Sequence, residues 1–455
     1  MLFYCQFGRL FTVLLLLSIS GCSVIGEQDY QYSVENSPAN YQKWRHQQNE
    51  TVQVSLLTDL IAIDELNDLV LLAMDKNPSL QQTAAALQIS YAQRGIAASE
   101  RIPHLSAGLN ADNKKDSDTT YSADLTVSWE IDLWQKISDS VSAAEMDIKS
   151  SEMTYQSARD VLAANVMRSW LQINLSQQLL EIEKQRLTAL ENNEISIVER
   201  YRAGLGELEE LDSARSSSAK TRAALVDYAE QLAQKQRSLQ LLLGQNPQSD
   251  NIQISAEFPA VSAPLTNLPE QDLGRRPDLQ SAYYNILANQ YRTDIAYKAL
   301  LPSISLSASL SSLAAAPSDV LFGSGAWSLL GQLTAPLFQG GKLRSEIEIA
   351  QLSAEQSYWL YQETLLNAVN EVENALGQEL SLTRQQEHLN EALSSAQTNF
   401  ANYQVKYRQG LVDILDLLAV QQQTFDLQSQ LIEVTYLQLN NRIDLGLALG
   451  LGVSS

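Results

Sequence analysis

Few residues of this chain are of the types that carry out side-chain chemistry. Its 455 residues include two cysteines and three histidines, and the histidines (His46, His104 and His388) are too scattered to indicate a metal cluster. The sequence contains no Gly-x-Ser-x-Gly, no phosphate-binding loop and no ligand spacing typical of a metal site. Its many carboxylates follow repetitive helical stretches, which disfavours a glycosidase pair. We therefore expect no catalytic residue, no metal and no enzyme activity.

Cys22 is the residue for which the sequence predicts a covalent modification. Residues 1–21 have the features of a lipoprotein signal peptide: Arg9 precedes an apolar run, from Leu10 to Leu17, that is too short to span a bilayer. The run leads into Ile19-Ser20-Gly21-Cys22, which resembles a bacterial lipobox, where the cysteine is lipidated and becomes the mature N-terminus. The alternative is an ordinary signal peptide with a chance cysteine. Ser23, where an aspartate would signal inner-membrane retention, favours the outer membrane.

Lipid on Cys22 is the only non-protein group that we expect. Cys5 leaves with the leader, so lipidation of Cys22 would leave a mature chain without a thiol, and disulfides and cysteine metal sites are excluded.

The net charge of −22 limits the partners of the chain. Nucleic acid is excluded as a partner, because phosphates require clustered lysine and arginine. An acidic field of one sign could line a water-filled conduit and concentrate cations in it, or could simply be a soluble acidic surface. Composition alone leaves both interpretations open.

The chain repeats one unit after an offset of about 200 residues. Residues 22–55 are predicted to be a polar, lipidated tether, residues 56–245 the first repeat, and residues 277–455 the second. Between them, residues 246–276 hold four prolines and form a connector. Each repeat opens with a proline-initiated helix, at Pro78 or Pro277, and continues into strands.

Each repeat then contributes two strands and two long helices. Strict alternation of apolar and polar residues predicts strands at about 102–113, 120–131, 302–313 and 325–337. Helices are expected over 137–203 and 341–409, each about 100 Å long at 1.5 Å per residue. Returning helices are expected over 207–243 and 412–445, and apolar spacings of three and four predict side-by-side packing.

Four strands are too few to seal a sheet in lipid. About eight strands is the smallest workable transmembrane barrel, and open edges in lipid leave backbone groups unpaired. Either the strands lie outside a membrane, in a periplasmic coiled-coil scaffold without a pore, or several chains share one barrel. We favour a mainly α fold with a membrane β-barrel contribution, because aromatic residues fall near both ends of the strands, as in membrane girdles. These residues are Tyr121, Trp129, Trp134, Trp327 and Phe338.

Four segments resemble the outer-membrane factor family, the TolC-like channel-tunnels, and in particular its OprM/NodT-type lipoprotein branch. They are the lipobox, the segment from Leu268-Pro269 to Arg275-Arg276-Pro277-Asp278-Leu279, and the paired motifs Tyr201-Arg202-Ala203-Gly204-Leu205 and Tyr407-Arg408-Gln409-Gly410-Leu411. The resemblance implies a homotrimer with a twelve-stranded barrel in the outer membrane above a periplasmic α-helical tunnel. It also implies a periplasmic adaptor protein and an inner-membrane pump as partners.

The resemblance assigns roles to two groups of residues. Gly204, Leu205, Gly410 and Leu411 correspond to the helix-hairpin tips that meet the adaptor, although they could also be simple hairpin turns without a partner. Asp413 and Asp416 are the candidate gate, since three copies would bring six carboxylates together. Relatives place an aspartate further along, in Leu-Asp-Ala-Gln, where this chain has Leu418-Ala419-Val420-Gln421. The two aspartates are therefore substitute candidates, and the alternative is an acidic helix start favoured by the helix dipole.

The predicted function is that of an exit duct in a tripartite efflux pump for drugs or other small molecules. The alternatives within the same fold are a duct for type I protein secretion or for metal-ion efflux. The scarcity of methionine and histidine disfavours a dedicated soft-metal route.

Overall fold

The computed structural model describes residues 30, 34, 56–61, 63–115, 118–247, 254, 257–259 and 273–453. The predicted signal peptide, Cys22, all of the tether except Tyr30 and Val34, and most of the connector lie outside these residues.

The two halves of the chain contain helices of equal length. The first half runs through η2 (Leu57–Ile61), α3 (Asp64–Lys76), α4 (Pro78–Ser99), β1 (His104–Asp112), β2 (Thr120–Ile131), α5 (Lys136–Arg202) and α6 (Leu208–Leu242). The second runs through η3 (Leu273–Arg275), α7 (Pro277–Lys298), β3 (Ser303–Ala314), α8 (Pro317–Phe322), β4 (Ala326–Thr334), α9 (Lys342–Arg408) and α10 (Ile414–Ala448). The pairs α4 and α7, α5 and α9, and α6 and α10 have 22, 67 and 35 residues per helix.

The predicted long helices are confirmed, and their ends lie within three residues of the expected bounds. Both 67-residue helices end where a glycine has a positive φ, 71° at Gly204 and 74° at Gly410. Two short elements, η2 and α3, precede α4, and the six-residue helix α8 lies between β3 and β4. Strand β4 ends at Thr334, before Pro336, which has no backbone N–H to donate to a ladder.

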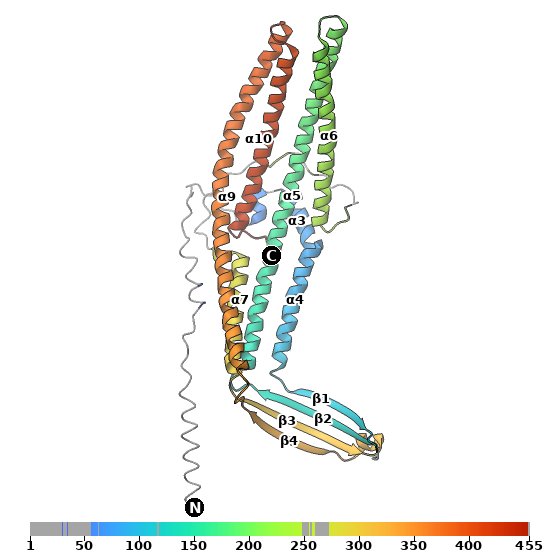
Figure 1. The fold of residues 1–455 in the computed structure, drawn as a ribbon, viewed down its shortest axis with the longest axis vertical. Helices are drawn as coiled ribbons and strands as arrows, with labels where there is room; N and C mark the ends of the chain where they lie inside the picture. The colour runs from blue at the N-terminus through green and yellow to red at the C-terminus, as the bar shows by residue number, and fades with distance from the viewer. Residues whose placement is uncertain are drawn as a thin grey trace, which may run out of the picture.

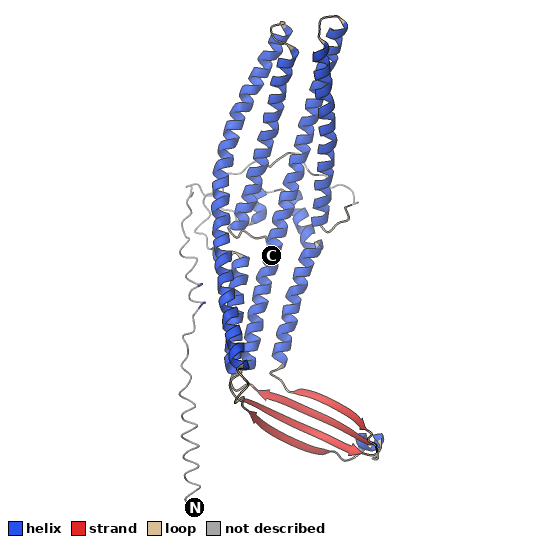
Figure 2. Ribbon diagram, viewed as in Figure 1, coloured by secondary structure: helices blue, strands red, loops and turns tan. Residues whose placement is uncertain are grey.

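The helices form a layer one helix thick (Figures 1 and 2). In the half next to the sheet the packing order is α4–α5–α7–α9, and in the half toward the tips it is α6–α5–α10–α9. Helix α9 thus occupies one edge of the layer over its whole length, and α4 and α6 occupy the other edge. The molecule is therefore a curved wall rather than a solid bundle.

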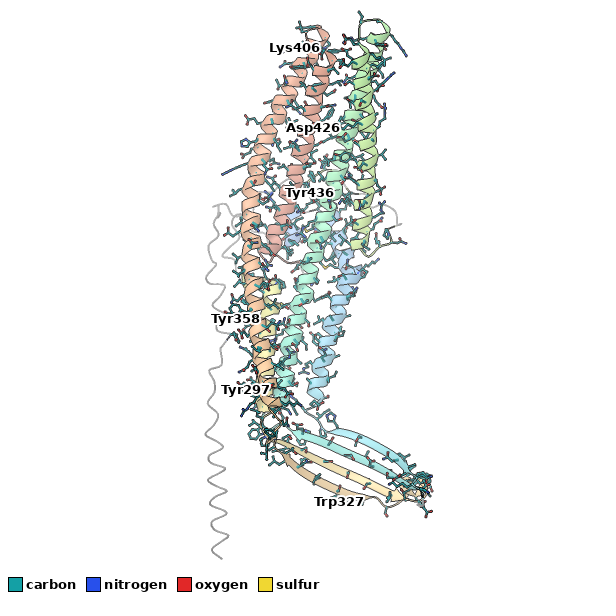
Figure 3. All side chains as sticks on the ribbon, viewed as in Figure 1. Tyr297, Trp327, Tyr358, Lys406, Asp426 and Tyr436 are labelled. Atoms are coloured by element: carbon teal, nitrogen blue, oxygen red, sulfur yellow. The ribbon has the colours of Figure 1, made fainter. Side chains whose placement is uncertain are left out.

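The sheet is antiparallel, has the order β1-β2-β3-β4, and lies at the opposite end of the molecule from the hairpin tips (Figure 1). The register brings Leu105, Val127, Ala308 and Leu329 side by side across all four strands. Because side chains alternate along a strand, one face of the sheet is apolar and the other carries mainly serine and other polar residues. Figure 3 places Trp327 in the sheet and Lys406 near a tip.

The main hydrophobic core lies midway along the wall, where η2, α3 and the end of α10 pack against α5, α7 and α9. Asn77 joins two elements there: its side-chain oxygen caps α4 at the Leu80 N–H (3.0 Å), and its amide donates to the Leu242 carbonyl (2.8 Å). Among the described residues, no helix combines the length and apolar character needed to traverse a membrane.

Candidate functional site

The two hairpin tips have the same backbone construction. At the first, the Leu205 N–H bonds to the Arg200 carbonyl (2.9 Å), and at the second the Leu411 N–H bonds to the Lys406 carbonyl (3.0 Å). Each is the helix-ending motif in which a glycine takes the left-handed conformation. The following leucines are largely exposed, Leu205 by 71% and Leu411 by 68%. The four tip residues predicted from the sequence therefore form two matched turns, each with an apolar side chain facing outward.

A contact that the sequence did not predict joins the tips to each other. The guanidinium of Arg200 donates to the Tyr407 hydroxyl (3.0 Å) and lies 5.7 Å from the centre of its ring. The same side chain donates to the Leu205 carbonyl (3.3 Å). The hydrogen bond with Tyr407 raises the pKa of Arg200, a side chain that is cationic at physiological pH in any case.

A second hydrophobic cluster lies just below the tips and packs the two hairpins together. Its buried members come from α5, α6 and α10: Leu190, Ile197, Leu211, Ala214, Ile414, Leu417 and Leu418. Further along, Asn193 donates to Gln421 (2.9 Å) and Arg186 pairs with Asp426 (2.8 Å). The tips are therefore held by one packed unit and do not project as separate arms.

The candidate gate residues lie beside each other at the start of α10. The Asp413 carboxylate caps the helix by accepting the Asp416 N–H (2.8 Å), and both side chains are exposed. In the first half, Glu207 and Glu210 form a reciprocal capping box at the start of α6. Asp413 thus performs the helix-start role that the sequence left as an alternative, while a gating role for either aspartate stays a prediction.

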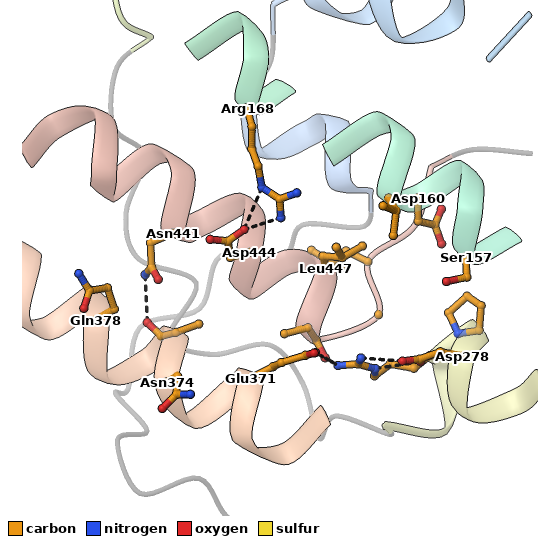
Figure 4. A pocket seen from close by; sticks show the side chains of 17 residues that line it. Ser157, Asp160, Arg168, Asp278, Glu371, Asn374, Gln378, Asn441, Asp444 and Leu447 are labelled. Atoms are coloured by element: carbon orange, nitrogen blue, oxygen red, sulfur yellow. Dashed lines mark hydrogen bonds and ion pairs between the residues drawn. The ribbon is translucent and has the colours of Figure 1, made fainter. Parts of the chain in front are cut away.

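The Arg275-Arg276-Pro277-Asp278 motif has a structural role in the middle of the wall. The buried Arg276 guanidinium bonds to both oxygens of Asp278 (3.0 and 2.7 Å), to Glu371 of α9 (2.7 Å) and to the Ala448 carbonyl at the end of α10 (3.0 Å). Burial lowers the pKa of Arg276, but the bonds to Asp278 and Glu371 outweigh this effect and raise it overall. The Arg276 side chain therefore joins α7, α9 and α10, and two of its partners, Asp278 and Glu371, are labelled in Figure 4.

Asp160 of α5 also binds the last described residues of the chain. Its buried carboxylate accepts the Val453 N–H (3.0 Å) and the Gln156 amide (2.9 Å). Burial raises the pKa of Asp160, although these two hydrogen bonds and Arg159 act in the opposite direction. Leu57 adds a backbone bond to the Gly452 carbonyl (2.9 Å), so the N-terminal and C-terminal parts of the described chain meet here.

A cavity of about 650 Å³ lies beside this junction, lined by residues of α5, α7, α9 and α10. Four carboxylates (Asp160, Asp278, Glu371 and Asp444) and two arginines (Arg168 and Arg276) line it, and Arg168 pairs with Asp444 (Figure 4). Within the part of the chain that the structure describes, no group of three or more histidine, cysteine or acidic residues is arranged to hold a metal ion. Arg168 pairs with Asp444, and Arg276 pairs with Asp278 and Glu371, so these ion pairs join helices.

The apolar face of the sheet is exposed in the single chain. Its large exposed members include Leu105, Leu109, Leu125, Leu310, Trp327, Leu329 and Leu333. A continuous apolar surface of this kind on a protein marks a contact with lipid or with another protein. At the helical end of the sheet, the Trp129 and Trp134 ring N–H groups donate to the Arg101 and Pro302 carbonyls (3.1 and 2.6 Å).

An amphipathic four-stranded sheet joined to a wall of very long paired helices defines the class of outer-membrane channel-tunnels. The chain belongs to the outer membrane efflux protein family, whose model matches residues 69–245 and 268–451. The chain is thus an outer-membrane protein that takes part in efflux, and its family consists of channels rather than enzymes.

Individual relatives span nearly the whole chain. The probable outer membrane lipoprotein SilC of Salmonella typhimurium is 28% identical over 390 residues, which are 84% of each chain. The cation efflux system protein CusC of Escherichia coli O6:H1 is 27% identical over 457 residues, 96% of this chain and 97% of the relative. The toluene efflux pump outer membrane protein TtgI of Pseudomonas putida is 27% identical over 459 residues, again 96% and 97%.

Solved structures of similar proteins have the same fold. A crystal structure of CusC superposes with a TM-score of 0.80 at 24% identity, covering 89% of this chain and 96% of that one. The CmeC outer membrane channel of Campylobacter jejuni superposes with a TM-score of 0.81 at 22% identity, covering 89% and 90%. The predicted fold class and family are therefore confirmed.

Proposed function

We propose that three copies of this chain share one barrel of three times four strands and form the exit duct of a tripartite efflux pump. One observation carries this proposal: a four-stranded sheet with a continuous apolar face and two unpaired edges, β1 and β4, is attached to a wall one helix thick. Neither the sheet edge nor the wall is closed in a single copy, and unpaired edges in lipid cost several kcal/mol for each backbone group. Closure of both by further copies gives one continuous aqueous path.

The experiment is a measurement of mass and conductance on the full-length protein. Detergent-extracted protein should have the native mass of a trimer, and it should produce ion conductance in planar bilayers. A stable monomer in the aqueous periplasm without conductance would refute the duct and favour the scaffold without a pore.

The adaptor is proposed to bind at the two tips. Leu205 and Leu411 are exposed apolar side chains, and Arg202, Lys406 and Arg408 add positive charge around them. Leu205→Ala with Leu411→Ala should abolish efflux and cross-linking to the adaptor while conductance of the isolated trimer stays unchanged. Unchanged efflux would remove the contact assignment and leave simple hairpin turns.

The gate is proposed to involve Asp413 and Asp416. Asp413→Asn with Asp416→Asn removes two charges per chain and leaves an oxygen to cap α10, so helix unfolding does not confuse the result. Reduced repulsion and reduced cation binding should change conductance and its cation preference. The matched control is Glu209→Gln with Asp212→Asn at the other tip, and an equal effect of both pairs would refute a specific gate.

We propose small organic molecules as cargo. SilC is named as a probable outer membrane lipoprotein and CusC as a cation efflux system protein, whereas TtgI is named as part of a toluene efflux pump. The names of the relatives therefore do not decide the cargo. A soft-metal route is disfavoured because the whole chain has five methionines, and Met167 is fully buried. Deletion of the gene should sensitise cells to apolar organic compounds, and sensitivity to copper and silver alone would refute this choice.

Lipid on Cys22 is proposed to be the anchor, and no other bound group and no catalytic step is assigned to the chain. Mass spectrometry of the mature N-terminal peptide should find a diacylglycerol and an acyl group on Cys22. An N-terminus without lipid at that position would leave only the ordinary signal peptide.

A further inference from the structure

We propose that the junction between the sheet and the helical wall binds the headgroup of a zwitterionic glycerophospholipid of the phosphatidylethanolamine type. Lys136 is the ligand for the phosphate and Glu130 the ligand for the ammonium group. This inference rests on the placement of the sheet in the outer membrane proposed above, and it gives each copy of the chain a lipid site of its own.

The site is a cavity of about 660 Å³ at the end of the sheet nearest the helices. It is lined from three connections: residues 132–135 between β2 and α5, 299–302 between α7 and β3, and 335–341 between β4 and α9 (Figure 1). Ile131, which pairs with Ile304 on the apolar face of the sheet, and Glu130, on the polar face, both line it. The cavity therefore adjoins both faces and suits an amphipathic ligand.

The apolar part of the lining suits acyl chains. Four large apolar side chains that are 40% to 96% exposed line the cavity: Leu133, Leu301, Leu337 and Phe338. Exposed apolar groups gathered in this way mark a contact with lipid or protein. Trp134 lies among them with its ring N–H bonded to the Pro302 carbonyl, and tryptophan is typical of the membrane–water boundary. The cavity is therefore at the level where acyl chains meet headgroups.

Two of the four charged side chains that line the cavity are committed to contacts within the chain. The Asp132 carboxylate accepts the Ile137 and Ser138 N–H groups at the start of α5 (3.0 and 2.7 Å). Lys298 pairs with Asp139, whose side chain is 13% exposed.

The other two charges, Lys136 and Glu130, are available to a ligand. They pair with each other at 3.0 Å, and their side chains stay 37% and 42% exposed. An exposed ion pair of this kind contributes little to stability, so it opens at little cost.

A zwitterionic headgroup complements this pair. With its phosphate on Lys136 and its ammonium on Glu130, one exposed ion pair is replaced by two charge-assisted contacts. An anionic headgroup such as phosphatidylglycerol would leave Glu130 without a cation and bring a phosphate near Asp132. A choline headgroup has no N–H to donate to Glu130. The pair therefore selects a primary ammonium group.

The position of the cavity favours a lipid over the other ligands with these polar groups. Free phosphoethanolamine carries the same charges but would leave Leu337 and Phe338 in water. The protein partners proposed above act at the hairpin tips, at the other end of the molecule, where Figure 3 labels Lys406. A membrane lipid of the periplasm-facing leaflet satisfies both the charges and the apolar lining.

The experiment is native mass spectrometry of the full-length protein in detergent, supplied with phosphatidylethanolamine, phosphatidylglycerol or phosphatidylcholine of the same acyl chains. Phosphatidylethanolamine should be retained about tenfold more strongly than the other two, at up to one molecule per copy. Lys136→Gln should reduce this retention about tenfold. The matched control is Lys114→Gln, which removes a 74% exposed lysine that pairs with Asp112 at the other end of the sheet, and it should retain lipid like the parent chain.

A second variant tests the ammonium contact separately. Glu130→Gln keeps the phosphate ligand, so lipid should still bind, but the preference for phosphatidylethanolamine over phosphatidylglycerol should be lost. This variant also serves if Lys136→Gln folds poorly. Soluble phosphoethanolamine should not displace the lipid, and its binding in the absence of retained lipid would overturn the lipid assignment.

The same spectra separate this inference from the shared barrel, because they give the mass of the assembly and the number of bound lipids independently. A trimer that retains lipid in the Lys136-dependent manner supports the site. A trimer that retains no lipid, retains the three lipids equally, or is unaffected by Lys136→Gln overturns the site while the shared barrel stands. A monomer overturns the shared barrel, and its lipid count still decides the site.

Discussion

Removal of Arg276 should release the end of α10 from the wall. In Arg276→Ala, the buried Ala448 carbonyl loses its guanidinium donor, and Asp278 and Glu371 lose their shared cation. An unsatisfied buried acceptor costs about 1–3 kcal/mol. The carboxylates add little, since the Asp278 and Glu371 side chains are 36% and 53% exposed and water can solvate them. We therefore expect a loss of about 2–3 kcal/mol, on the scale of a hydrogen bond to a charged group.

Hydrogen exchange measures this loss where it occurs. The N–H groups of Leu449, Gly450, Leu451 and Val453 are all hydrogen-bonded at this junction. A loss of 2–3 kcal/mol should raise their opening by about 30- to 150-fold, because about 1.4 kcal/mol corresponds to a factor of ten. Mass spectrometry of C-terminal peptides from the purified protein gives the exchange rates.

Two variants test the reasoning. Arg275→Ala removes the neighbouring arginine, which is exposed, and should leave exchange unchanged. Arg276→Lys keeps the positive charge but loses the planar guanidinium group that reaches both carboxylates and the carbonyl. Its exchange rate should therefore lie between those of the wild type and Arg276→Ala. Equal protection in Arg276→Ala and wild type would show that the Arg276 contacts do not hold the end of α10.

Three further predictions concern stability. Burial raises the pKa of Asp160, so keeping its carboxylate ionised destabilises the fold at neutral pH. Asp160→Asn should therefore raise the apparent unfolding temperature at pH 7, and the difference should shrink as the pH falls below the ordinary aspartate value of 3.8, where the carboxyl is protonated in both the folded and the unfolded chain. An equal gain at both pH values would contradict the assigned cause. Gly410 has φ of 74° and open space where the Cβ of an alanine would lie, so Gly410→Ala should cost about 1 kcal/mol through backbone strain alone, detected as faster exchange at that tip. Leu365 is fully buried in the main core, and Leu365→Ala should cost about 2–5 kcal/mol in chemical denaturation; a smaller loss would mean that the core collapses into the space.

Local sequence signals predicted the features that depend on short-range order. The long helices follow from apolar positions spaced three and four residues apart, in α5 over a stretch without proline or glycine, and they end before Gly204 and Gly410, where a left-handed turn favours glycine. The strands follow from strict alternation. The hairpin-tip turns were found for the same reason, since the two tip motifs repeat one pattern.

Contacts between residues far apart in the sequence were not predicted. Arg276 meets Ala448 across 172 positions, and Arg200 meets Tyr407 across 207, so no periodicity of three, four or two reports them. The repeated arginine–tyrosine and lysine–tyrosine pairs at the tips were a signal that could have drawn attention to Arg200. The role of Asp413 as a helix cap was accessible from sequence, because an aspartate three residues before a second acidic residue at a helix start is a capping pattern.

Because the paired helices have equal lengths, the two tips lie level only if segments far apart in the sequence keep matching lengths. Deleting seven residues from α5 alone would lower one tip by about 10 Å relative to the other, at 1.5 Å per residue. The same deletion in α9, with compensating deletions in α6 and α10, would bring the two tips level again. A change in the length of one long helix therefore requires matching changes in the other three if the two tips are to stay level, so four separate segments together set the length of the wall.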